Sequence, residues 1–142
     1  MAKKKLPITE RVKNFNDVCV ELGTTEAAFN EGLAKIGLVT PTEESDEDDP
    51  FVKHIKAAIA TIKLRMIAQV LNEGWTPDWS DYNQYKYTPY FEANDDNTGL
   101  VFLYVDDWFA RTDVGSRLCF VSRDIARYAA TQFIDIYTDF LN

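Results

Sequence analysis

The stretch 71–92 constrains the fold more than any other part of this chain, because the spacing of apolar residues changes across it. Before this stretch apolar residues recur at helical spacing, and after it they alternate with a period of two. Large aromatic side chains fill the stretch, and each buries on the order of 150–250 Å² when packed. We therefore expect an aromatic joint between a helical half and a sheet, formed by Trp75, Trp79, Tyr85, Tyr87 and Phe91.

The N-terminal half predicts two short helices and one long helix. The short helices are expected over 15–22 and from about residue 25 to residue 36. The long helix begins at Pro50, which suits the first helical position, and ends before Gly74, which suits the turn after a last helical residue. Each helix is preceded by a residue type that caps helix N-termini, namely Asn14, Thr24 or Thr25, and Asp49.

The C-terminal half predicts three short strands, over 85–92, 100–105 and 117–121, followed by one helix capped by Ser122. Pro89 places the first strand at an edge or a bulge, because proline lacks the N–H that a ladder needs. The expected fold class is α+β. N-terminal helices and one long central helix precede a three-stranded antiparallel sheet, and a C-terminal helix packs on that sheet.

At 142 residues the chain is expected to form a single domain over 8–142, preceded by a flexible basic tail at 1–7. The segment 39–49 is polar and rich in carboxylates, so it is expected to be a solvated acidic loop. No apolar run approaches the roughly 20 residues needed to cross a membrane. Cys19 and Cys119 match no metal or redox spacing, and they are interpreted as reduced buried thiols of a cytoplasmic protein.

The sequence offers no assembled catalytic set, so neither an enzyme activity nor a cofactor or metal is expected. His54 is the single histidine and is interpreted as a surface residue. The weak alternative is a metal-dependent enzyme that uses Asp106, Asp107 and Asp113 as ligands near strand ends. Loop carboxylates are more often simply solvated.

Two sets of residues are candidates for binding. A net charge of −8 argues against sequence-independent binding of nucleic acid. Four arginines close to aromatic residues nevertheless suggest stacking on single strands. The competing interpretation, which we favour, pairs these arginines with neighbouring aspartates. Tyrosine is enriched in interface hot spots, and alternation leaves Tyr90 on the face opposite Tyr87. The candidate binding residues are Tyr82, Tyr90, Arg111, Arg117, Arg123 and Arg127.

Several segments resemble a family of small uncharacterised proteins encoded by phages and prophages of gut Bacteroidetes. The resemblance is carried by 72–79 (NEGWTPDW), 84–91 (QYKYTPYF), 114–120 (VGSRLCF) and 129–135. It covers most of the chain and is weakest at 37–50. The resemblance implies a viral or mobile-element origin, and it brings no activity and no functional residues.

These observations together predict a non-enzymatic, phage-encoded binding protein that acts on a host or viral protein. It would work in the cytoplasm of the bacterial host or as part of the virion, and a small homo-oligomer is one form that it could take. One variant is an acidic anti-defence protein that mimics nucleic acid. The alternative is a nucleic-acid-binding accessory protein that uses the arginine and aromatic residues.

Overall fold

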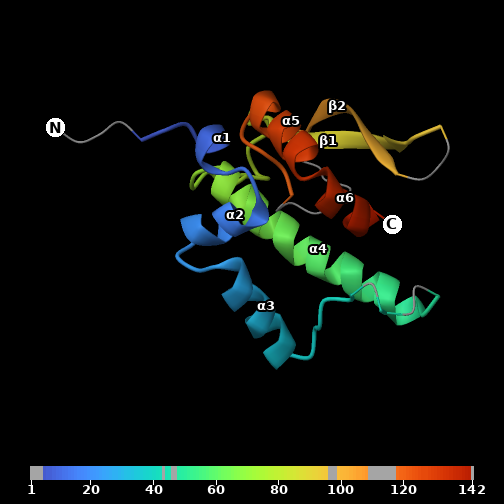
Figure 1. The fold of residues 1–142 in the computed structure, drawn as a ribbon. Coiled ribbons are helices and arrows are strands. Elements are labelled where there is room, and N and C mark those ends of the chain that lie inside the picture. Colours follow the sequence, from blue (N-terminus) through green and yellow to red (C-terminus); the bar gives the residue numbers. More distant parts are fainter. Residues whose placement is uncertain (1–4, 43, 46–47, 96–98, 109–117, 142) are drawn as a thin grey trace.

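The computed structural model describes residues 5–42, 44–45, 48–95, 99–108 and 118–141, and it has the predicted α+β class (Figure 1). Over these residues the elements are α1 (Ile8–Arg11), α2 (Phe15–Glu21), α3 (Glu26–Lys35), α4 (Pro50–Leu71), β1 (Lys86–Ala93), β2 (Leu100–Trp108), α5 (Arg123–Gln132) and α6 (Ile134–Leu141).

The helix starts confirm the capping pattern in the sequence. Each expected cap accepts a hydrogen bond from a backbone amide two or three residues ahead, at 2.8–3.2 Å. Each such bond satisfies one of the amides that a helix start leaves without a partner. The caps are Asn14, Thr25, Asp49 and Ser122. The short helix α1 was not anticipated from the sequence.

The long helix α4 is the centre of the core. Its buried residues include Leu64, Ile67, Ala68 and Leu71, none of which is more than 2% exposed. In Figure 1, α2 lies on one side of α4, while α5, α6 and the sheet lie on the other. Because it is covered from both sides, α4 needs a wide apolar surface, which its sequence supplies.

Among the described residues, the sheet is a two-stranded antiparallel hairpin. β1 and β2 pair from Lys86 opposite Trp108 to Ala93 opposite Leu100, with an irregularity in the ladder after Tyr90. Helices α5 and α6 pack against this hairpin, and the Phe91 ring lies 4.7 Å from the ring of Tyr137 in α6. A hairpin is marginal by itself, so this helical cover is what stabilises it.

The prediction of a third strand at 117–121 is wrong for 118–121, the part of this segment that the structure describes. Within that segment only Phe120 pairs with the sheet, through hydrogen bonds of 2.8 and 3.1 Å with the backbone of Tyr87. Extending this pairing from Tyr87 towards Pro89 would require a backbone N–H at Pro89, which proline lacks. In the other direction Ser122 already caps α5, so the chain turns into a helix instead of extending the ladder.

The expected single C-terminal helix is also divided, at Phe133, into α5 and α6. Phe133 leaves helical geometry, with φ −117° and ψ 31°, and its side chain is buried. The break serves two packing surfaces, because α5 contacts both strands whereas α6 contacts mainly α4. Across the described residues, no helix combines the length and the hydropathy needed to span a membrane.

Candidate functional site

The outer face of the hairpin, opposite α5 and α6, carries a cluster of exposed apolar side chains. The rings of Tyr90 and Tyr104 stack across the strands, with centroids 5.2 Å apart and planes 8° from parallel. The two tyrosines, Val101 and Leu103 are 46–50% exposed. We call Tyr90, Val101, Leu103 and Tyr104 the outer-face patch.

The pairing register explains why these side chains face outwards. Tyr90 lies opposite Tyr104, but Phe91 lies opposite Phe102, so β2 contains one extra residue, Leu103, at this point. A bulge of this kind re-aims the side chains around it. On one side of the bulge the two phenylalanines meet edge to face, 6.3 Å apart, and pack against the core. The tyrosine pair is left facing away from the helices.

Carboxylates accompany the outer-face patch. Glu92 follows Tyr90 by two residues and is therefore on the same face, and Asp106 is two residues beyond Tyr104. Glu92 is exposed and Asp106 is half-buried. The outer face thus presents an apolar centre beside negative charge.

The other tyrosines of the aromatic joint take different positions. Tyr82 is 72% exposed, in the loop before β1. Tyr85 is exposed as well, and its ring stacks on that of the half-buried Tyr87 with a centroid distance of 6.1 Å. Tyr87 and Phe91 face the helices, and both pack against the core cluster.

The two tryptophans of the aromatic joint have different surroundings. Trp79 covers Lys86, which is fully buried at the start of β1. The Lys86 ammonium lies 5.3 Å from the Trp79 ring centroid and donates to the Asp81 carbonyl at 2.9 Å. The indole N–H of Trp79 is buried, and no described residue accepts a hydrogen bond from it. Trp75 instead lines a pocket beside α4.

Of the four candidate arginines, two can be placed. Arg123 donates to the carbonyl of Val105 at 2.6 Å, lies 3.6 Å from the Asp107 carboxylate and covers the ring of Tyr87 at 5.4 Å. Its guanidinium is therefore engaged within the fold. Arg127 is exposed on α5. The two remaining arginines, Arg111 and Arg117, lie outside the described residues.

The aspartates considered for a metal site are only partly placed. Asp106 accepts a hydrogen bond from the backbone amide of Asp107, and Asp107 pairs with Arg123. Asp113 lies outside the described residues. Where the structure does describe the chain, no three His, Cys, Asp or Glu side chains gather closely enough to hold a metal ion.

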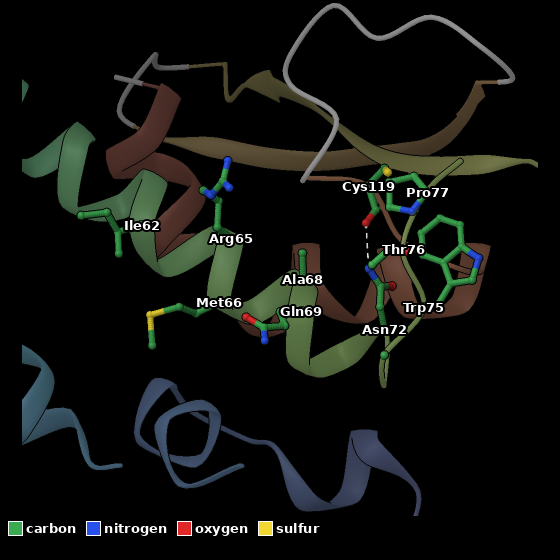
Figure 2. A pocket seen from close by; sticks show the side chains of 11 residues that line it. Ile62, Arg65, Met66, Ala68, Gln69, Asn72, Trp75, Thr76, Pro77 and Cys119 are labelled. Atoms are coloured by element: carbon green, nitrogen blue, oxygen red, sulfur yellow. Dashed lines mark hydrogen bonds between the residues drawn. The ribbon is translucent and has the colours of Figure 1, made fainter. Parts of the chain in front are cut away.

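A second candidate site is a pocket of about 590 Å³ beside the C-terminal half of α4 (Figure 2). Residues from one face of α4 line it, and Trp75, Thr76, Pro77 and Cys119 lie together at one end. Its volume lies within the 300–1,000 Å³ typical of small-molecule sites.

Asn72 lies at the end of this pocket that carries Cys119, and the sequence analysis did not single it out. The side chain is 7% exposed. Its amide donates to the carbonyl of Cys119 at 3.0 Å, and its oxygen accepts from the amide of Val121 at 2.9 Å. It thus joins the end of α4 to a segment 47 residues later. The position of an amide side chain directly after the apolar face of a helix was its signal in the sequence.

Both cysteines are buried, and neither forms a disulfide within the described part of the chain. Burial raises the pKa of the Cys119 thiol to about 11, so the group stays protonated near neutral pH. Burial raises the pKa of Cys19 too, with a further contribution from the charge of Glu26. Neither thiol is therefore suited to act as a nucleophile, since the thiolate is the reactive form.

Comparison of the chain with models of known protein families, with curated proteins and with solved structures finds no match.

Proposed function

We propose that this chain is a non-enzymatic binding protein of a phage or prophage, and that the outer-face patch is its contact surface for a host or viral protein. The observation that carries the proposal is the stacked pair Tyr90–Tyr104 with Val101 and Leu103, each about half exposed on the face of the hairpin that α5 and α6 leave open. Aromatic side chains of this kind supply much of the binding energy at protein interfaces.

The charge of the chain indicates the chemistry of the partner. The protein carries a net charge of −8, and Glu92 and Asp106 accompany the patch on its own face. The complementary surface has an apolar centre and a rim of lysine or arginine. Binding by apolar contacts at the centre and charge at the rim would associate faster at low ionic strength.

The arginine-based alternative receives less support. Arg123 already contacts a backbone carbonyl, the Asp107 carboxylate and the ring of Tyr87. A guanidinium held in this way is a poor starting point for binding phosphate or for stacking on a base.

The test is a tagged pull-down from host lysate, with and without nuclease, followed by identification of the retained proteins. The candidate partner is then purified, and its affinity is compared for three forms of the chain. The double variant Leu103→Ser/Tyr104→Ser should weaken binding by about tenfold or more. Phe51→Ser is the matched control, because Phe51 is an exposed aromatic residue in the first turn of α4 and not in the outer-face patch.

Equal affinity of the wild type and the double variant for the purified partner would refute the outer-face patch as the contact surface. Recovery of nucleic acid, with every co-purified protein lost on nuclease treatment, would favour the arginine-based alternative instead.

A further inference from the structure

The pocket beside α4 has a local charge opposite to that of the protein. The chain has 23 acidic against 15 basic residues, yet no carboxylate is among the described residues that line this pocket. The single charged residue in the lining is Arg65. Arg65 is exposed, and its guanidinium makes neither an ion pair nor a hydrogen bond within the described part of the chain. Its guanidinium is therefore available to an anion.

The rest of the lining suits an apolar body. Trp75 is half-buried and offers an aromatic wall, and the side chains of Ile62 and Met66 add apolar surface from α4. In Figure 2, Arg65 stands on α4 at some distance from Trp75, Thr76 and Pro77, which close the other end. Apolar walls with a few polar groups are the usual composition of small-molecule sites.

The helix sets the spacing of these groups. Arg65 precedes the end of α4 by about two turns, which places it roughly 10 Å along the axis from the loop that carries Trp75. Gln69 lies one turn beyond Arg65 on the same face and supplies an amide between the two ends. A ligand that reached both ends would be elongated, with its charge at one end.

From this arrangement we infer that the pocket binds an elongated aromatic carboxylate, whose carboxylate pairs with Arg65 and whose ring packs on Trp75. The site is separate from the outer-face patch, and it does not depend on the protein-binding proposal. The high pKa of Cys119 leaves the complex non-covalent.

The test uses three probes that differ in charge or length: biphenyl-4-carboxylate, biphenyl-4-carboxamide and benzoate. Binding is followed by amide chemical shifts in two-dimensional NMR titrations, with attention to Gln69 and the indole N–H of Trp75. The biphenyl carboxylate should bind at least about fivefold more tightly than the neutral amide, because it forms a charge-assisted hydrogen bond. It should also bind more tightly than benzoate, which is too short to reach both ends.

Two variants and a control assign the residues. Arg65→Gln should abolish the preference for the carboxylate over the carboxamide, whereas Trp75→Leu should weaken both biphenyl probes. Arg127→Gln, which removes an exposed arginine that does not line the pocket, should leave all affinities unchanged. Arg65 is exposed, so its replacement should not disturb folding.

Three results would each overturn the inference: no saturable shift with biphenyl-4-carboxylate, equal affinity for the carboxylate and the carboxamide, or an undiminished preference in Arg65→Gln.

Discussion

Replacing Asn72 with alanine should destabilise the protein by about 2 kcal/mol. The side chain makes two hydrogen bonds, of 3.0 Å to the Cys119 carbonyl and 2.9 Å from the Val121 amide, and each contributes about 1 kcal/mol net. Asn72 has helical backbone angles, φ −77° and ψ −9°, which alanine adopts without strain. The loss therefore reports the side chain alone, and it corresponds to a fall in Tm of about 6 °C for a chain of this size.

Urea unfolding measures this loss as a shift of the midpoint at constant slope. Gln69→Ala is the control on the same helix, since Gln69 is exposed, and it should change stability by less than about 0.5 kcal/mol. If Asn72→Ala also lowered the free energy of unfolding by less than about 0.5 kcal/mol, the role assigned to Asn72 would be refuted.

The aspartate variant separates the two bonds. Asn72→Asp keeps the acceptor for the Val121 amide but turns a carboxylate oxygen towards the Cys119 carbonyl. At neutral pH this variant should be at least as unstable as Asn72→Ala. Acidification protonates the carboxyl and restores a donor, so the gap to the wild type should narrow as the pH falls.

The remaining predictions test packing, backbone geometry and titration. Phe133→Ala should cost about 3–5 kcal/mol in urea unfolding, because the ring is buried where α5 gives way to α6, and a loss under about 1 kcal/mol would contradict that placement. Gly74→Ala should destabilise the protein by about 1 kcal/mol through backbone strain alone, because φ is +89° and no atom lies near an added Cβ. Gly32→Ala inside α3 should stabilise the protein, because alanine fits a helix interior. Changes of the same sign for both variants would refute this argument from backbone geometry. The pKa of Cys119, raised from 9.0 to about 11, means that the folded state holds this proton more tightly, so stability should fall as the pH rises through that window. Cys119→Ala should flatten this fall, and an unchanged pH profile in that variant would show that Cys119 does not cause it.

Local signals in the sequence were sufficient for the helix starts. Asn14, Asp49 and Ser122 each act within three residues, so their role is visible in a short window of sequence. The same applies to the long apolar face of α4. The caps and the apolar face each depend on hydrogen bonds or residue spacing within one element, and the tertiary contacts of this fold favour the same helices.

Features set by tertiary contacts were not predicted. Apolar residues continue at helical spacing through Phe133, so nothing local marks the division of the last helix. The partners of Asn72 lie 47 and 49 residues away. The stacking of Tyr90 on Tyr104 depends on the bulge at Leu103, which shifts the register by one residue. Alternation along the strand predicted the exposure of Tyr90, but it did not predict that Tyr104 would be its stacking partner.

The attachment of α3 has a consequence for how the molecule opens. α3 packs mainly against α2, chiefly through the edge-to-face contact of Phe29 with Phe15, and Leu33 is its only fully buried residue. In Figure 1 it extends away from the helices that surround α4. So few apolar contacts hold α3 that it should detach and unravel without the rest of the fold, as a separate cooperative unit. Its amides would then exchange with solvent well before those of α4, and limited proteolysis would first cut next to it, leaving the central helix and the hairpin intact.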